Sequence, residues 1–502
     1  MDLFDNLALG FSVALTLQNV SYALIGCVLG TLIGVLPGLG PSATIAMLLP
    51  SVYMLDPAAA LIMLAGIYYG SQYGGSTTAI LVKIPGEASS VVTVIDGHEM
   101  ARQGRAGPAL AAAGLSSFFA GCVGTVIIAA FAPPLVGVAL KFGPAEYCSL
   151  MVLGLICATV LASGSLLRAV AMVILGLLVG QINTDVISGT PRYSFGIPEL
   201  MDGLNLVAVA MGIFAFTEIM INLSRPSEKR EAATRKVAGL WPTKEDFKSA
   251  SPAVIRGTLL GSVLGVLPGG GALLSSFASY AMEKKLAGEK GKFGAGDIRG
   301  VAGPEAANNA GAQTSFIPML TLGIPSTASM ALMVGAMIIK GIQPGPLVMT
   351  NNPELFWGLI ASMWVGNVAL ILLNLPLIGI WVKLLTLPYR CMFPSIMVFC
   401  IIGLYTLNTN NFDIYVGALF AVIGYVFYKL RCEAAPFLLG FILGPMMEEN
   451  LRRALLVSHG DWTTFVSHPI SASLLIAAFA LLLIVAVPAL KSRRQEVFAE
   501  HN

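Results

Sequence analysis

Long apolar runs separated by short polar stretches recur along the whole chain. They fall near residues 12–36, 42–55, 57–70, 109–140, 145–163, 166–182, 204–223, 252–280, 314–341, 355–382, 391–407, 411–430, 433–446 and 470–490. Crossing ~30 Å of hydrocarbon takes about 20 helical residues, so some of these runs span a bilayer and others are too short. The alternation typical of barrel strands is absent. The pattern predicts an all-α polytopic membrane protein, in which helices satisfy the backbone hydrogen bonds.

One long stretch, residues 224–252, is polar throughout and divides the chain. It predicts a membrane repeat over residues 1–223, a cytoplasmic linker over 224–252 and a second membrane repeat over 253–502. Basic residues outnumber acidic ones in the linker, and three more lie in the C-terminal tail, so both are expected in the cytoplasm. The N-terminus carries no basic residue before the first run and is expected on the outer side. The two halves would therefore enter the membrane in opposite directions.

Three short motifs occur in both halves, in the same order. "GVLPGLGP" at residues 34–41 returns as "GVLPGGGA" at 265–272, "KIPGEASS" at 83–90 as "GIPSTASM" at 323–330, and "QGRAGPAL" at 103–110 resembles "QPGPLV" at 343–348. The frequency of glycine and proline in membrane helices explains any one match, but not the shared order. The order predicts two inverted structural repeats.

The repeated motifs break helices inside apolar runs. Proline removes a backbone hydrogen bond, and clustered glycines let the chain leave helical geometry. Non-helical backbone at membrane depth is tolerated only where protein buries it or a polar cavity borders it. A half-helix that starts after a break presents free N–H groups to an anion, and carbonyls at the other end suit a cation. The alternative, close packing of small residues, fits the glycines at 26, 30, 34, 257, 261 and 265 but not the flanking prolines and hydroxyls.

Each half also contains a region rich in hydroxyls and amides, residues 68–90 and 303–330. Together with the glycine–proline motifs they give four broken or re-entrant elements, which are expected to converge on one site near the midplane. Glu305 is a candidate ligand for a coupling cation, and capping of a helix start is an equal alternative. Lys83 is expected to lie at a water interface. Two charged stretches, 96–107 with His98 and 283–300, are expected to be solvated loops.

Composition narrows the function classes. The chain has 502 residues, of which 56% are hydrophobic and 11% charged, with a mean hydropathy of +0.81, which excludes a soluble globular protein. The net charge of +2 suggests no nucleic-acid partner. No P-loop is present, and neither the seven cysteines nor the four histidines show metal-ligand spacing. We therefore expect no enzyme activity, no cofactor and no metal beyond a possible Na⁺.

Several long motifs carry a family likeness. "GVLPGLGPSATIAMLLP", "YYGSQYGGSTTAILVKIPGEASSVVTVIDGHEMARQGRAGPAL", "FGPAEY", "GVLPGGG", "GPEAANNA" and "LTLGIPSTASMA" resemble the large membrane subunit of bacterial tripartite tricarboxylate transporters, the TctA family. The resemblance implies an inner-membrane secondary importer for a carboxylate, driven by a Na⁺ or H⁺ gradient. It also implies two partners, a small membrane subunit of about four spans and a periplasmic solute-binding protein. The N-terminus would then be periplasmic and the C-terminus cytoplasmic.

The resemblance also places the substrate- or ion-binding site on the matching motif positions. These are Pro37, Gly38, Gly40, Ser42, Thr44, Gly74, Gly75, Ser76, Thr77, Pro85, Gly86, Gly269, Gly270, Gly271, Ser275, Asn308, Asn309, Thr314, Pro325, Ser326 and Thr327. An elevator-type architecture is the leading mechanical hypothesis, while rocking about a fixed site would use similar motifs. The alternative function is a passive organic-anion channel, although the chain lacks the ring of like charges that such filters use.

Overall fold

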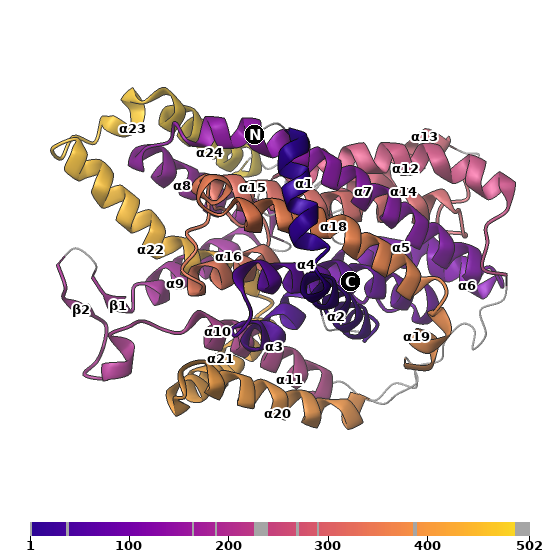
Figure 1. Cartoon of the computed structure of the whole chain (residues 1–502), viewed down its shortest axis with the longest axis horizontal. Helices are drawn as coiled ribbons and strands as arrows, with labels where there is room; N and C mark the ends of the chain where they lie inside the picture. The colour runs from indigo at the N-terminus through magenta and orange to yellow at the C-terminus, as the bar shows by residue number, and fades with distance from the viewer. Residues whose placement is uncertain are drawn as a thin grey trace.

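The computed structural model describes residues 3–36, 40–162, 165–185, 188–224, 239–267, 271–288, 291–384 and 389–486. Over these residues the chain is almost entirely helical, apart from one short antiparallel hairpin, so the all-α prediction is confirmed (Figure 1). The elements of the first half are α1 (Leu3–Ala14), α2 (Leu17–Gly34), α3 (Pro41–Val52), α4 (Pro57–Val82), η1 (Ala88–Ser90), α5 (Val91–Thr93), η2 (Val94–His98), α6 (Glu99–Arg102), α7 (Ala106–Ala139), α8 (Pro144–Leu161), α9 (Leu166–Gly180), β1 (Asn183–Thr184), β2 (Pro191–Arg192), η3 (Pro198–Leu200), α10 (Leu206–Ala210), η4 (Met211–Phe216) and α11 (Thr217–Ser224).

The second half is also helical, with no strand among its described residues. Its elements are α12 (Lys244–Gly265), α13 (Gly271–Ala287), α14 (Arg299–Thr314), α15 (Phe316–Leu322), α16 (Ala328–Ile339), α17 (Leu347–Asn351), α18 (Pro353–Asn374), α19 (Ile378–Leu384), α20 (Tyr389–Asn408), α21 (Asn411–Lys429), α22 (Ala434–Val457), α23 (Thr464–Ser467) and α24 (Pro469–Ala486). Residues 225–238 of the predicted linker lie outside the described residues, and α12 already begins within the linker's predicted end.

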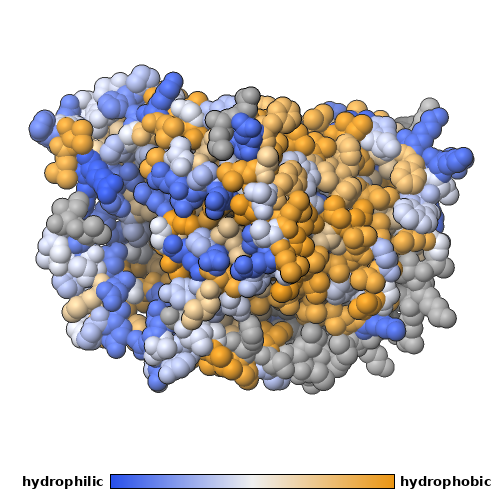
Figure 2. Space-filling model, viewed as in Figure 1, coloured by the Kyte–Doolittle hydropathy of each residue, from blue (hydrophilic) through white to orange (hydrophobic). Residues whose placement is uncertain are grey.

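The surface is that of a membrane protein. Five described helical segments are long and apolar enough to cross a bilayer: α2, α7, α10 to α11, α18 and α21. Large apolar side chains such as Leu17 and Leu167 are exposed, as lipid-facing side chains are expected to be. Figure 2 shows hydrophobic residues gathered over a broad central region, with hydrophilic ones concentrated at the left end, near the hairpin, α22 and α23, and at the right edge.

Helices α2 and α4 run parallel and touch along their backbones. A Cβ added at Gly70 would lie 2.6 Å from the Cys27 carbonyl oxygen, and one at Gly74 would lie 2.5 Å from the Thr31 oxygen. Gly26, Gly30 and Gly34 of α2 meet the α4 backbone in the same way. Only glycine allows this approach, so these residues pack helices together.

Helices α12 and α14 form a second pair of the same kind. Gly257, Gly261 and Gly265 of α12 face the backbone of Gly303, Ala307 and Gly311 in that order, which makes this pair parallel as well. A Cβ at Gly261 would lie 2.7 Å from the Ala307 Cα. The spaced glycines of both halves therefore have the packing role that their spacing suggested.

The two halves meet with their central helices antiparallel. Ser76 of α4 donates to the Glu305 carboxylate of α14 at 2.7 Å. Tyr69, which precedes Ser76 on α4, has its ring centre 5.7 Å from that of Phe316, which follows Glu305 at the start of α15. Contacts therefore move back along one half as they move forward along the other. A second contact joins α3 to α16, and a third joins α13 to η1. Each half-helix of one half thus lies beside a half-helix of the other.

The second break in each half has the same backbone geometry. Lys83 after α4 and Gly323 after α15 both adopt the left-handed conformation, with φ of 60° and 74°. Glu87 and Thr327 then start the next helical segment at nearly identical angles, φ −144° and ψ 168° against φ −141° and ψ 166°. The polar residues before each break lie on regular helix, since α4 runs unbroken to Val82 and α14 to Thr314.

The first of the two predicted loops is wrong, and the second is correct only for its middle part, since residues 291–298 are non-helical. Residues 96–102 are helical, and Asp96 is fully buried because its carboxylate accepts hydrogen bonds from the backbone N–H groups of Gly294, Gly296 and Asp297 and from the Tyr280 hydroxyl. His98 is half-buried, and its Nδ1 lies 3.1 Å from the Ile80 carbonyl oxygen. Part of the second stretch, up to Ala287, belongs to α13. The first stretch looks solvated in sequence because the partners of Asp96 come from the other half, whereas Glu283 of the second stretch pairs with Arg256 of its own half.

Replacing Gly70 with Ala should destabilise the protein, because the added Cβ would force α2 and α4 apart. We expect a loss of roughly 1–3 kcal/mol, as for other overpacked cores. Thermal unfolding of the detergent-purified chain measures it. Gly137→Ala is the matched control, since Gly137 lies in α7 with no atom within 4 Å of its added Cβ. Equal melting temperatures for the two variants would contradict the close packing.

Candidate functional site

The starts of four helical segments lie together between the two halves. The Ser42 and Ser329 hydroxyls, in the first turns of α3 and α16, are 2.9 Å apart. The start of α13 is adjacent, since a Cβ on Gly271 would lie 2.9 Å from the Thr327 methyl group. Helix α13 in turn contacts η1, which begins after Glu87. Four helix N-termini therefore surround one region, and their partial positive charges favour an anion there.

Glu87 lies in this region and is 7% exposed. Its carboxylate accepts a hydrogen bond from the Ser89 hydroxyl and a second from the Asn308 amide, at 3.3 Å. The Ser89 hydroxyl is also 3.1 Å from the Gln72 amide oxygen. The Asn308 Oδ1 atom is buried and has no hydrogen-bond partner among the described residues.

Glu305, which is 1% exposed, is the second buried carboxylate. Thr93 donates to one carboxylate oxygen, and Ser76 donates to the other at 2.7 Å. The Asn309 amide donates to the Glu305 main-chain oxygen at 3.1 Å and to the Ser117 hydroxyl at 2.7 Å. Glu305 lies in the second turn of α14 and is held by side chains of other helices, so it does not act as a helix cap.

The two carboxylates have no ion-pair partner among the described residues. A buried charge without a partner is costly, whereas a cation bound beside it compensates the charge. The arrangement therefore offers two complementary features side by side: helix N-termini for an anion, and carboxylate and hydroxyl oxygens for a cation.

The structure brings many of the predicted site residues into this region. Gly40 caps α3, Thr327 caps α16, and Gly271 begins α13. Gly86 packs against Gly75, and a Cβ on Gly75 would lie 2.8 Å from the Glu87 side chain. The others with a hydrogen bond in or next to the region are Ser42, Ser76, Asn308, Asn309 and Ser326. Pro85 and Pro325 lie in the two backbone breaks, half-buried and buried respectively.

Other predicted residues lie apart from the region or have local partners. Gly74 lies against α2, and the Thr314 hydroxyl faces Gly265 of α12. Thr44 and Ser275 donate to main-chain oxygens of their own helix starts, and Thr77 lines a small pocket. Pro37, Gly38, Gly269 and Gly270 lie outside the described residues.

Gln72, Glu87, Ser89 and Ser329 of the cluster lie within the hydroxyl- and amide-rich regions that the sequence placed at the site. Sequence reasoning missed Thr93 and Ser117. Thr93 lies one helical turn after the motif at 83–90, so its position carried a signal. Ser117 had none, because it sits in an apolar stretch of α7 that the repeats do not mark.

Comparison with known proteins identifies the family. The model of the tripartite tricarboxylate transporter TctA family matches residues 20–439. The chain belongs to the TctA family. It is 56% identical over 502 residues, the full length of both chains, to an uncharacterized 52.8 kDa protein in the TAR-I ttuC′ 3′ region of Agrobacterium vitis. It is 58% identical over 242 residues to an uncharacterized protein in the TAR-II ttuC′ 3′ region of the same organism, covering 48% of this chain and 100% of that one. No solved structure matches the chain.

Membership of the TctA family makes this chain a component of a tripartite transporter. The family match covers both carboxylates and all four helix starts, since Gly40, Glu87, Gly271, Glu305 and Thr327 lie within the matched residues. The predicted recognition is thus confirmed, and the polar region lies within the part of the chain that defines the family.

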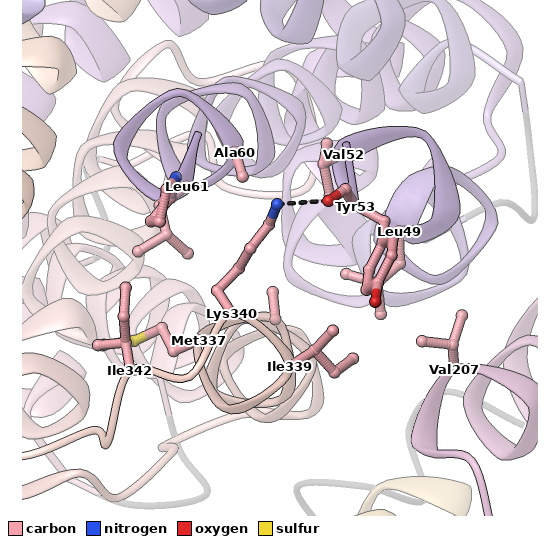
Figure 3. A pocket seen from close by; sticks show the side chains of 12 residues that line it. Leu49, Val52, Tyr53, Ala60, Leu61, Val207, Met337, Ile339, Lys340 and Ile342 are labelled. Carbon is pink, nitrogen blue, oxygen red and sulfur yellow. Dashed lines mark hydrogen bonds between the residues drawn. The ribbon is translucent and has the colours of Figure 1, made fainter. Parts of the chain in front are cut away.

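A lysine joins the far ends of α3 and α16. Lys340, just after α16, donates to the main-chain oxygen of Tyr53, which follows α3 (Figure 3). It also donates to the main-chain oxygen of Leu55. Its ammonium also lies 5.5 Å from the centre of the Tyr53 ring. The surrounding pocket is largely apolar, with Leu49, Val207 and Met337 among its lining residues (Figure 3). Since the two helices are joined at both ends, they form one parallel unit.

Cysteines placed at Ser42 and Ser329 should form a disulfide on mild oxidation. The two hydroxyl oxygens are 2.9 Å apart, which fits the close Cβ approach that a disulfide requires. Peptide mass spectrometry of oxidised membranes detects the link despite the native cysteines. Ser329→Cys paired with Ser473→Cys, an exposed position on α24, is the control. A link in the control and none in the test pair would show that the starts of α3 and α16 are apart.

Proposed function

We propose that this chain is the transport subunit of a secondary active importer that moves a small carboxylate across the bacterial inner membrane. The proposal rests chiefly on one observation: four helix N-termini meet beside two buried, unpaired carboxylates. Helix N-termini bind anions, and carboxylates bind cations, so the site suits a carboxylate carried together with Na⁺ or H⁺. Family membership supports a transporter component, and it supports this role more than an enzymatic one.

The proposed architecture is a pair of inverted repeats. Three observations support it: the matched glycine pairs of α2 with α4 and of α12 with α14, the matched backbone angles at Lys83 and Gly323, and the antiparallel contact of α4 with α14. Paired repeats of this kind place substrate and ion sites at the repeat interface. The ties between α3 and α16 favour an elevator, in which the broken elements move together against the remaining helices.

The proposed assembly includes a small membrane subunit of about four spans and a periplasmic solute-binding protein that delivers the carboxylate. The end that carries β1, β2 and α23 would face the periplasm, and the end that carries α6 and the start of α12 would face the cytoplasm. This orientation agrees with the basic residues of the linker. No cofactor is required, because the gradient of the coupling ion supplies the free energy.

Proteoliposomes that contain the complete complex should accumulate the carboxylate against its gradient when Na⁺ or H⁺ is supplied on the outside. The expected result is uptake that needs the binding protein and stops when both ion gradients are collapsed, with no requirement for ATP. Radiolabelled substrate measures the internal concentration. Accumulation that persists without either gradient, or flux that only equilibrates the substrate, would contradict coupled import and favour a passive channel.

Replacing Asn309 with Ala should reduce uptake several-fold without lowering the amount of protein in the membrane. The change removes the bond to Ser117 that holds α14 beside α7 next to Glu305. Loss of one such buried bond costs about 1–3 kcal/mol. Asn450→Ala is the control, because Asn450 donates only to the main chain of its own helix, at 2.8 Å. Unchanged substrate and ion dependence in the Asn309 variant would remove this residue from the site.

A further inference from the structure

A second polar cavity lies beside the described site, between α4, α7 and α18. Its polar lining comes from Tyr73, Ser76 and Thr77 of α4, Ser117 of α7 and Asn374 at the end of α18. None of these residues belongs to the four helix starts. The remaining lining is small or apolar and includes Leu110, Ala113 and Gly114.

Two of the lining oxygens have no hydrogen-bond partner in the part of the chain that the structure describes. The Tyr73 hydroxyl and the Asn374 Oδ1 atom are buried without a hydrogen bond, and their residues are only 3% and 4% exposed. The Asn374 amide N–H is already used, because it donates to the Leu370 main-chain oxygen at 2.9 Å. Buried polar atoms are nearly always bonded, so two such atoms on one cavity indicate that a water molecule or an ion occupies it.

The chemistry of the cavity favours a cation. Its orphan Asn374 atom is an acceptor only, and its hydroxyls present oxygen lone pairs. Ser76 connects the cavity directly to the negative charge, since its hydroxyl donates to the Glu305 carboxylate at 2.7 Å. Ser117 connects to the same residue through Asn309. No lysine, arginine or histidine is among the lining residues.

The number and type of oxygens favour a monovalent metal ion. A divalent ion in a site of hard oxygen ligands normally has direct carboxylate ligands, and this cavity has none. A proton needs only one acceptor, and both Glu305 carboxylate oxygens already accept hydroxyl hydrogens. Five neutral oxygen-bearing side chains, with one carboxylate behind them, suit Na⁺.

We propose that Na⁺ binds in this cavity, with Asn374 and Tyr73 as ligands and Glu305 as the counter-charge behind Ser76. The site is distinct from the helix starts that hold the carboxylate. This inference rests on the proposed import function, because it assigns the coupling ion its own position. Na⁺ in the cavity neutralises Glu305 and so stabilises the contact of α4 with α14, on which the substrate region depends.

The Asn374→Leu variant tests the assignment in proteoliposomes that contain the complete complex. Removing one ligand oxygen should raise the Na⁺ concentration for half-maximal uptake about tenfold, while the substrate KM at saturating Na⁺ stays unchanged. Asn367→Leu is the matched control: it lies two turns earlier on α18, is 1% exposed and does not line the cavity. The same Na⁺ dependence in both variants, or a change confined to substrate KM, would overturn the proposal.

A second readout does not depend on transport. A cysteine at Ala113, which lines the cavity, should react with a small thiol reagent in the reconstituted complex, and Na⁺ should protect it more than K⁺ does. Peptide mass spectrometry reports this position separately from the native cysteines. Protection by Na⁺ without concentrative uptake would sink the proposed function and leave the cavity assignment standing. Uptake driven by H⁺ alone, with equal labelling in Na⁺ and K⁺, would sink the cavity assignment and leave import standing.

Discussion

The structure depends on one constraint: backbone N–H and C=O groups inside a bilayer must be bonded or shielded from lipid. The two described interruptions of helical backbone, at residues 83–87 and 323–327, are compatible with that constraint because Gly86, Glu87 and residues 323–326 are buried in protein, while Lys83 is exposed. The glycine-lined contacts of α2 with α4 and of α12 with α14 bring the breaks close to neighbouring backbone, and Gly86 packs directly on Gly75. Without this close packing, the free N–H groups at the helix starts would face hydrocarbon. With it, they face one another across a polar region.

In the proposed function, the same packing places an anion site and a cation site in one small region. The helix starts contribute partial positive charge, while Glu87 and Glu305 contribute negative charge a few side chains away. Asn308 and Asn309 are neighbours on α14 and reach the two sides, one to Glu87 and the other to Ser117. In the proposed importer, binding of one ion would therefore change the electrostatic environment of the other, which would be the physical basis of coupling.

The sequence predicted the structure well where its motifs occur in both halves. It did not predict contacts between residues that lie far apart in the chain. The apolar runs predicted the all-α fold class, and the motifs of proline, glycine, serine and threonine predicted the helix breaks and most residues around them. Glycine spacing alone could not distinguish a packing role from a binding role. The contacts of Gly70 and Gly261 with neighbouring backbone show that these glycines pack helices together. The burial of Asp96 was not predictable, because its partners lie about 200 residues away in the chain. The positions of Ser117 and Asn374 beside α4 were not predictable for the same reason, because they arise from the packing of α7 and α18 on α4.

The most direct test of the account is a cryo-electron microscopy map of the complete complex with its carboxylate bound in Na⁺. The account predicts ligand density bordered by Ser42, Ser89, Gly271 and Ser329, between the starts of α3, η1, α13 and α16. Density for the carboxylate in the apolar pocket around Lys340, or at the hairpin end of the molecule with the helix starts separated from one another, would contradict it.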